Sequence, residues 1–572
     1  MTDSPTQNAA GKAATPTFAE LFTPKLVTVM REGYGLSALR DDAVAGLTVA
    51  IVAIPLCMAI AIASGLPPDR GLFTAIIGGF LISAFGGSRF QIGGPAGAFI
   101  VLVASVVERH GYEGLVLATA IAGALMLAVG FLRLGTYIKY IPYPVTVGFT
   151  SGIAVIIFAS QIKEILGLDL PSEPAALVPK IEAIAGAIST ADWRTMAISL
   201  LALVIIIGLR RVRPNWPGFL IAVGTCSVVA VFLTPDVATI GSRFGGIPDR
   251  LPAPSVPHLD FEKIRSVFPD AVAIAILGSI ESLLSALVAD GMTGRRHRSN
   301  CELVAQGGAN IAAVIFGGMP VTGTIARTAT NVRAGARGPV SGLLHAVYVL
   351  AFVMVAAPLA SYVPLAALGA VLAIVSWNMA EREEFVSLIR SSPGDALVLL
   401  ATFLLTVFED LTLGISVGVT LGAFLFLHRM AEATEIEGGA PLVAKDEADG
   451  PAATRIPYAG STAQDPDIVI YKINGAFFFG ATANVISTLE RIGKMPRAFV
   501  LDFDSVPLVD ATAAKSLEAF ARRLQALGST LYIAGARVAV RRALLRAGLR
   551  EPHVHFVESV QQARTASAMA TT

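Results

Sequence analysis

The chain has 572 residues, of which 54% are hydrophobic and only 15% are charged, and its mean hydropathy is +0.68. A soluble protein carries about 25% charged residues, so this composition predicts a polytopic membrane protein. The formal net charge of +1 gives no basic surplus for binding nucleic acid.

The first forty residues are polar or mixed in character. They lack a basic start followed by a short apolar stretch, so no cleaved signal peptide is predicted. We expect residues 1–40 to form a cytoplasmic segment, with an amphipathic helix around Phe18–Arg31 at the membrane interface.

Apolar segments fill residues 41–430, which we interpret as a transmembrane domain. Several are shorter than the ~20 residues that a full membrane span needs, most clearly the third and the tenth. The fourteen segments cover residues 43–64, 70–87, 95–107, 114–132, 144–163, 194–209, 217–234, 268–289, 301–316, 322–333, 340–358, 363–379, 394–408 and 411–428.

The basic residues between these segments predict the orientation of the chain. Lys and Arg are enriched in the cytoplasmic loops of membrane proteins, and here they gather in alternate loops. An even number of segments then places both termini in the cytoplasm. The residues concerned are Arg89, Arg133, Lys139, Arg210, Arg211, Arg213, Arg295, Arg296, Arg298, Arg333, Arg337, Arg382 and Arg390.

The two half-length segments occupy corresponding positions in two halves of the domain. The third follows Gly93-Gly94-Pro95 and the tenth follows Gly317-Gly318-Met319-Pro320, an offset of about 225 residues. Because each half has an odd number of segments, the halves must be inverted relative to each other. This pattern predicts 7+7 inverted repeats with a binding site near the midplane.

The tenth segment carries polar side chains on one face. Read as a helix, it places Thr324, Arg327, Thr328 and Asn331 at i, i+3, i+4 and i+7. A charge at membrane depth usually marks a functional site. The alternative is an arginine at the membrane boundary that extends to water.

If the two half-helices meet at their N-termini, their free N–H groups and positive dipole ends converge on one point. Such a point would bind a small anion beside Arg327, although glycine and alanine there also serve close helix packing. The predicted substrate-binding residues are Gly94, Pro95, Ala96, Gly97, Thr322, Gly323, Thr324, Ala326 and Arg327, with Gln91 and Asn331 as weaker cavity-lining candidates.

Glu281 lies midway along the eighth segment. A carboxylate there is either ion-paired, with Arg327 as a candidate partner, or protonated through loss of water. Both states suit a coupling or gating residue, and the alternative is a fixed ion pair between helices. No nucleophile elbow, P-loop, HExxH or CxxC motif is present, so the sequence predicts neither an enzyme nor a resident cofactor or metal.

After a polar linker over residues 431–464, residues 465–567 predict a small cytoplasmic α/β domain. Asp510 is placed to cap a helix start there. Strands are expected at Ile468–Ile473, Phe477–Phe479, Ala498–Phe503, Thr530–Ile533 and Val554–Phe556, and helices at Thr482–Ile492, Ala511–Leu527, Val538–Ala547 and Ser559–Ala566.

The chain resembles the sulfate permease (SulP) family of anion transporters, and its tail resembles the STAS domain that follows in that family. The residues that carry the first resemblance are Ala45–Val49, Ile54–Leu56, Gly93–Ala96 and Gly323–Gly335. A narrower similarity to the bacterial C4-dicarboxylate branch rests on Glu281–Leu284, Asp290–Gly294, Ala329–Ala336 and Ser376–Met379.

The resemblance implies core and gate domains, an elevator-type motion, a homodimer and a site between the third and tenth segments. It identifies Arg327 as the family's basic residue and Glu281 as its eighth-segment carboxylate. The residue before that arginine is often serine but is Ala326 here. In the STAS domain, Thr512 keeps one hydroxyl of a regulatory Asp-Ser-Ser-Gly motif, so a phospho-switch and a soluble protein partner are implied only weakly.

The resulting hypothesis is a secondary active transporter of a small anion, with H⁺ or Na⁺ as the coupling ion. C4-dicarboxylate (such as succinate) and sulfate are the first candidates for the substrate, with proton coupling. A sodium-coupled bicarbonate transporter, a passive anion channel with a regulatory STAS domain, and a membrane-anchored regulatory protein are the alternatives.

Overall fold

The computed structural model divides the chain into two compact units, Met1–Val419 and Thr420–Thr572. The predicted helix at Thr482–Ile492 and most of the predicted linker lie outside the residues that it describes. The described residues are 17–170, 174, 176–213, 216–256, 260–409, 411–432, 435–436, 468–478 and 496–569.

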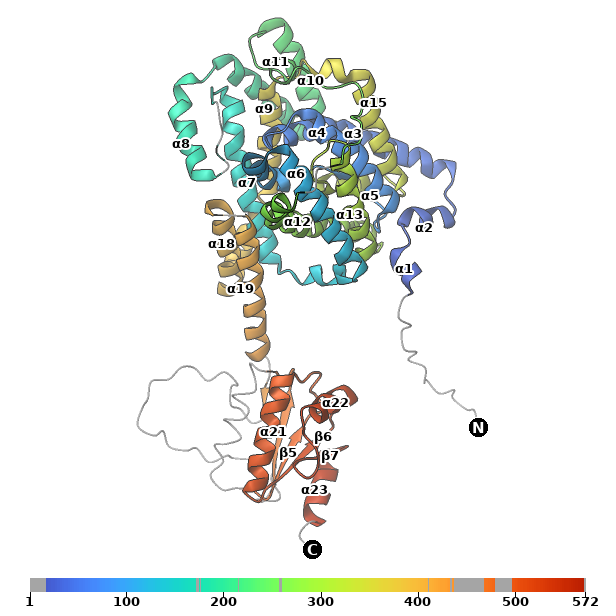
Figure 1. Cartoon of the computed structure of the whole chain (residues 1–572), viewed down its shortest axis with the longest axis vertical. Helices are drawn as coiled ribbons and strands as arrows, with labels where there is room; N and C mark the ends of the chain where they lie inside the picture. Colours follow the sequence, from blue (N-terminus) through green and yellow to red (C-terminus); the bar gives the residue numbers. More distant parts are fainter. Residues whose placement is uncertain are drawn as a thin grey trace. The chain divides into compact units, whose positions relative to one another are not determined.

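Every predicted apolar segment coincides with a helix or a run of short helices (Figure 1). In chain order these are α3 (Leu36–Ala63), α4 (Pro68–Phe73) with the π-helix Thr74–Gly78 and α5 (Gly79–Phe85), the 3₁₀ turn Gly97–Phe99 with α6 (Ile100–Phe131), α7 (Tyr143–Leu166), α9 (Trp193–Val212), α10 (Gly218–Leu233), α12 (Phe261–Thr293), α13 (Ser299–Ile315), α14 (Ile325–Arg333), α15 (Val340–Ala360), α16 (Leu365–Met379), α18 (Pro393–Phe408) and α19 (Leu411–Glu432).

Among the described residues, eight helices are long and apolar enough to cross a membrane, and α10 and α18 are shorter apolar helices. The third and fourth predicted segments are the two helical parts of α6, on either side of a non-helical kink. Gly111 makes that kink with φ of 67°, a left-handed conformation that glycine adopts without steric cost. With nine residues, α14 is roughly 13 Å long and cannot cross a bilayer alone.

The predicted single helix around Phe18–Arg31 is wrong in one respect. The structure has two helices, α1 (Phe18–Phe22) and α2 (Lys25–Arg31), separated at Thr23 and Pro24. Proline disfavours the helical conformation of the residue before it, and Thr23 is extended. Further short helices occur in the connections, namely the 3₁₀ helices Leu134–Tyr140 and Ile188–Thr190, α8 (Leu177–Ala187), α11 (Ile240–Phe244) and α17 (Arg382–Ser391).

The helices of the first unit pack as two groups. In one, α6 packs on α12 and α13, while α3 packs on α15 and α14 contacts α12 and α3. In the other, α7 packs on α16 and α18, and α9 packs on α10 and α16. The interior is apolar and includes Cys57, Phe99 and Ile274, each fully buried. These groups correspond to the expected core and gate, which contact each other through α3 and α16.

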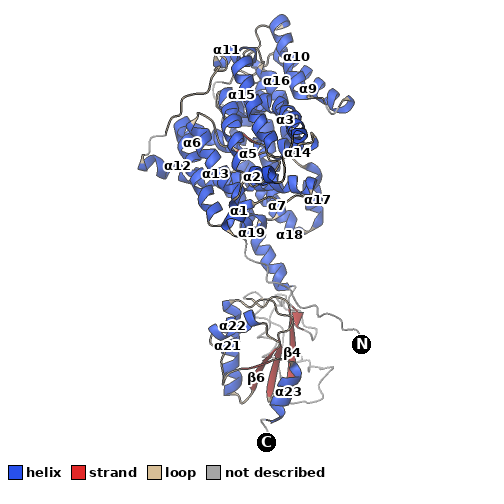
Figure 2. Ribbon diagram, turned by 90° about the vertical axis from the view of Figure 1, so that its right-hand side faces the viewer, coloured by secondary structure: helices blue, strands red, loops and turns tan. Residues whose placement is uncertain are grey.

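The second unit contains a five-stranded sheet of order β3-β4-β5-β6-β7 (Figure 2). β4, β5, β6 and β7 are parallel neighbours, and the two-residue β3 pairs antiparallel with β4. The strands are β3 (Glu435–Ile436), β4 (Ile468–Asn474), β5 (Ala498–Asp502), β6 (Thr530–Ala534) and β7 (His555–Val557).

Alternate strand residues pack on opposite faces of this sheet. On one face Phe499 and Leu501 pack against α21 (Ala511–Ala526) and α22 (Val538–Arg546), and on the other Val500 packs against α23 (Val560–Met569). The predicted strand at Phe477–Phe479 is reduced to an isolated bridge between Phe477 and Val509, and Phe479 lies outside the described residues.

Candidate functional site

The starts of the two half-length helices meet through a pair of two-residue strands. β1 (Gly93–Gly94) pairs antiparallel with β2 (Thr322–Gly323), with Gly93 opposite Gly323 and Gly94 opposite Thr322. The ladder continues one residue further, because the Thr324 N–H donates to the Ile92 carbonyl oxygen over 3.0 Å. Segments more than 220 residues apart in sequence are thereby held side by side deep in the first unit.

Each strand leads directly into a helix start that has no side-chain cap. The 3₁₀ turn Gly97–Phe99 follows β1, and α14 follows β2 with Thr324 at its N-cap position. The first N–H groups of a helix have no partner within the helix. Within the described part of the chain, the N–H groups of Ile325, Ala326 and Arg327 therefore remain available, together with the positive end of the helix dipole.

Arg327 crosses between the two helix starts. Its Nη2 donates a hydrogen bond to the carbonyl oxygen of Pro95 over 3.1 Å, and the residue is 3% exposed. Nε and Nη1 have no hydrogen-bond partner among the described residues. A buried guanidinium with unused donors is costly unless an anion or water completes its shell. Arg327 is therefore not an arginine at the membrane boundary that extends to bulk water.

Gly94 leaves room for the guanidinium of Arg327, which lies against it. A Cβ atom at Gly94 would be 2.0 Å from Arg327 Nη1 and 3.2 Å from its Cζ. Gly97 is partly exposed, and a Cβ there would face Met379 of α16 and Ile157 of α7 at ordinary contact distances. The helix start after β1 therefore faces the second group of helices. Ala96 is buried beside it.

Side chains of α12 hold β2 in place. Ser282 Oγ lies 2.6 Å from Thr322 Oγ1 and accepts the N–H of Gly323 at 3.3 Å, while Thr322 Oγ1 donates to the Gly278 carbonyl oxygen at 3.2 Å. Ser285 donates to the hydroxyl of Thr328 over 2.9 Å. These contacts orient the backbone of β2 and the first turn of α14.

The segment leading into β2 is fixed by other polar side chains. Asn310 on α13 donates to the Val321 carbonyl oxygen at 2.8 Å and accepts the Val321 N–H at 3.0 Å. Arg70 donates to the Gly317 carbonyl oxygen at 2.8 Å, and Tyr112 donates to that of Gly318 at the same distance. The residues before β2 are thus held from three helices.

The two predicted cavity-lining residues, Gln91 and Asn331, are buried and hydrogen-bonded to the surrounding chain. Gln91 is 3% exposed, donates to the Ser282 carbonyl oxygen at 3.2 Å and fills the space left by the missing side chain of Gly323. Asn331 is fully buried and donates to the Phe90 carbonyl oxygen and to Ser341 Oγ. Both side chains bind backbone or neighbouring side chains, which makes them positioning residues.

Glu281 is not paired with Arg327. No ion pair among the described residues includes Glu281, and the side chain is only partly buried, one residue before the fully buried Ser282. The alternative of a fixed ion pair between Glu281 and Arg327 is therefore wrong.

Ala326 is exposed, although the residues that follow it on α14, Arg327 and Thr328, are buried. Its methyl group occupies the second position of the helix, at the open side of the helix start. Sequence reasoning missed Ser282 and Ser285 as supports of the site. The spacing of Ser282 and Ser285 on one face of an apolar helix was the available signal.

In the second unit, Asp510 caps α21 as predicted. Its Oδ1 accepts the N–H of Ala513 over 2.7 Å. Thr512 is exposed in the first turn of that helix, where its hydroxyl is accessible.

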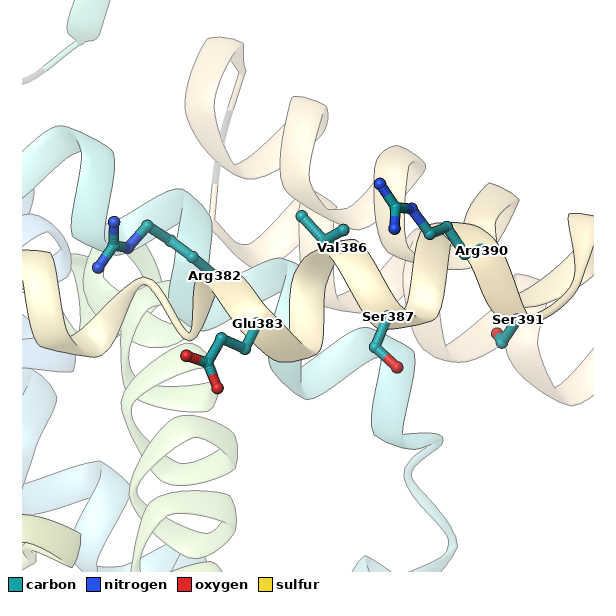
Figure 3. Close-up of a pocket in the computed structure, with 6 residues that line it drawn as sticks. All are labelled: Arg382, Glu383, Val386, Ser387, Arg390 and Ser391. Carbon is teal, nitrogen blue, oxygen red and sulfur yellow. The ribbon is translucent and has the colours of Figure 1, made fainter.

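A surface hollow of about 740 Å³ lies along α17 and is separate from the paired helix starts (Figure 3). Figure 3 shows Arg382 and Arg390 on one side of the helix and Glu383 on the other. Arg382 also stacks over the Trp377 ring at 4.0 Å. No predicted site residue lines this hollow, so the substrate is not assigned to it. The lining residues are Arg382, Glu383, Val386, Ser387, Arg390 and Ser391.

Comparison with protein families finds two matches. The sulfate permease family matches residues 39–402, and the STAS domain matches residues 461–563. A putative sulfate transporter, YvdB of Bacillus subtilis (strain 168), is 41% identical over 522 residues, which are 91% of this chain and 95% of the relative. The bicarbonate transporter BicA of Picosynechococcus sp. is 29% identical over 88% of this chain and 90% of its own.

Solved structures have the same fold. Murine Solute Carrier 26 family member A9, an anion transporter in the inward-facing state, superposes with a TM-score of 0.83 at 17% identity, covering 98% of this chain and 97% of the other. The transmembrane domain of BicA, from a cyanobacterium, has a TM-score of 0.61 at 31% identity, covering 67% of this chain and 98% of the other. The predicted fold, a helical membrane domain followed by an α/β STAS domain, is confirmed.

Proposed function

Because the chain belongs to the sulfate permease family and carries a C-terminal STAS domain, we propose that it is a secondary active transporter of a small oxyanion or dianion. It is a multi-pass membrane protein and a transporter rather than an enzyme. We place it in the inner membrane of a bacterium, as a homodimer with both termini and the STAS domain in the cytoplasm.

The observation that carries this proposal is the antiparallel pairing of β1 with β2. It brings together two uncapped helix starts, whose free N–H groups and dipoles favour negative charge. Arg327 adds a full positive charge beneath them, with two nitrogen atoms that lack protein partners among the described residues. Main-chain donors and one guanidinium form a site for a compact anion with several oxygen atoms.

Arg327 contributes in two ways in this proposal. In the present conformation its hydrogen bond to Pro95 and its burial make it a fixed positive charge behind the helix starts. Its Nη1 becomes a direct ligand only if the anion reaches past Gly94. The proposed transport cycle moves the α6–α12–α13 group against the α7–α16 group, as an elevator, and carries the paired helix starts with it.

Sulfate is the first substrate to test, because the most similar relatives include putative sulfate transporters. A C4-dicarboxylate such as succinate is the second, on the motif similarity around Glu281 and Asn331. Bicarbonate is the third, because BicA is among the relatives. Glu281, partly buried and without an ion-pair partner among the described residues, is the proposed coupling residue for H⁺.

The deciding experiment is uptake into proteoliposomes. Labelled sulfate, succinate and bicarbonate are each offered with an inward proton gradient, with a sodium gradient and with neither. Accumulation of one anion above its external concentration, only in the presence of a gradient, supports secondary active transport. Equilibration without accumulation under every gradient would indicate a passive channel.

A further inference from the structure

The STAS domain carries an unusually basic surface helix. Residues 519–550 contain seven arginines and no acidic residue. Five of these arginines lie on α22 or at its two ends, and all five are exposed. They are Arg537, Arg541, Arg542, Arg546 and Arg550. We call this surface the α22 arginine face.

The charges of the α22 arginine face are not neutralised by the described residues of the domain. None of its five arginines forms an ion pair with a described residue. Glu518 of α21, the acidic residue next to the C-terminal end of α22, is bound to Lys515 at 3.0 Å and to Arg522. The hydrogen bond from Lys515 holds the pKa of Glu518 below its ordinary value. The carboxylate of Glu518 is therefore already paired on its own helix.

Helix α22 is amphipathic, but its outer side carries apolar as well as basic side chains. Its buried side holds Val540 and Leu544, which belong to the core of the STAS domain. Its outer side mixes arginine with apolar side chains, since Val538 is 73% exposed and Leu545 is partly exposed. An apolar residue among arginines on an exposed helix face is typical of a surface that binds the headgroup region of a membrane.

We propose that the α22 arginine face binds anionic phospholipid headgroups of the membrane that the first unit spans. Guanidinium groups pair with phosphate through two parallel hydrogen bonds, and Val538 inserts between the headgroups. Among the described residues, the last helix long enough to span the membrane ends at Met430, and strand β4 begins at Ile468. The domain is therefore covalently held near a membrane surface, where even weak headgroup contacts are favoured.

A lipid reporter placed on the helix tests this proposal in the full-length chain. Cys57, Cys226 and Cys301 are all buried, so the substitution Val538→Cys provides one accessible thiol for a fluorophore. The labelled protein is reconstituted in nanodiscs that contain a spin-labelled quenching lipid. The discs are made either of phosphatidylcholine alone or of phosphatidylcholine mixed with phosphatidylglycerol. No substrate is present, so the result does not depend on transport.

We expect quenching in the discs with phosphatidylglycerol and its loss at high salt, because salt screens headgroup contacts. Each arginine near an anionic surface strengthens binding roughly fivefold, so the combined substitutions R541Q, R542Q and R546Q should weaken it roughly a hundredfold. Arg564 lies on α23, on the opposite face of the sheet, and R564Q should leave quenching unchanged.

Equal quenching in the two kinds of disc would overturn the proposal, as would quenching that survives the three substitutions. If the fluorophore becomes shielded only after an acidic soluble protein is added, the α22 arginine face is a protein-binding surface and the lipid assignment is wrong. Failure of uptake in the transport experiment would leave the lipid result intact, since the two experiments measure different units of the chain.

Discussion

Arg327 and Pro95 are joined by a hydrogen bond from Nη2 to the proline carbonyl oxygen, across two strands that are more than 220 residues apart in sequence. This contact links the two helix starts through one charged side chain. The same guanidinium therefore braces the paired strands and supplies the positive charge of the proposed anion site.

Replacing Arg327 with alanine should abolish concentrative uptake of every candidate anion. The loss of a hydrogen bond to a charged group is worth about 1.5–3 kcal/mol, so anion affinity should fall roughly 10- to 100-fold. Arg327→Lys should recover only part of it, because an ammonium cannot reproduce the fork of a guanidinium. Arg333→Ala on the exposed end of α14 is the matched control. Full uptake by the Arg327→Ala protein would refute the site assignment.

Replacing Gly94 with alanine should impair transport by displacing Arg327. The new Cβ would lie 2.0 Å from Nη1, so the guanidinium or the strand must shift. Overpacking of this kind costs about 1–3 kcal/mol of folding stability, which thermal unfolding of the purified protein can measure. Gly224→Ala on α10 is the control, because nothing lies within 4 Å of a Cβ at that position.

The hydroxyl groups of Ser282 and Thr322 should contribute to folding stability jointly rather than independently. Their hydroxyl oxygens are 2.6 Å apart, and Ser282 also accepts the Gly323 N–H. Each single substitution, Ser282→Ala and Thr322→Val, should destabilise the protein by about 1–3 kcal/mol, because it leaves a buried polar partner unsatisfied. The double variant should lose less than the sum of the two. Additive losses would show that the hydroxyls do not interact.

The paired strands illustrate what the sequence could predict. Proline and glycine at Gly93–Pro95 and Gly317–Pro320 break helices, and their offset revealed two corresponding half-helices. Arg327 was identifiable because a charge in an apolar chain is costly. The pairing of Gly94 with Thr322 could not be predicted from the sequence, because it depends on a contact between distant segments.

The buried contacts of Asn331 and Gln91 could not be predicted from the sequence. The polar face of a half-helix has the same sequence pattern whether it faces a cavity or buried main-chain groups. The amide of Asn331 binds the Phe90 carbonyl oxygen, which only the folded chain places beside it. The spacing of Ser282 and Ser285 could have indicated a polar contact on that face of α12, but it could not identify Thr322 and Thr328 as the partners.

Adding a hydroxyl at Ala326 should strengthen anion binding. The residue is exposed at the second position of α14, beside free N–H groups. In Ala326→Ser the new donor should lower the KM for the transported anion roughly 2- to 10-fold, the equivalent of a hydrogen bond of about 0.5–1.5 kcal/mol. Ala329→Ser makes the same change further along α14 and should leave KM unchanged. An unaltered KM in Ala326→Ser would place the anion away from this helix start.

Replacing Glu281 with glutamine should separate proton coupling from anion binding. Glutamine keeps the size of the side chain but cannot gain or lose a proton, so uptake driven by a pH gradient should stop accumulating substrate. Exchange of internal for external anion should continue, because the helix starts and Arg327 are untouched. Glu383→Gln on the exposed face of α17 changes a carboxylate outside the site and serves as the control. If the pH dependence of uptake survives in Glu281→Gln, the coupling proton is carried by another group.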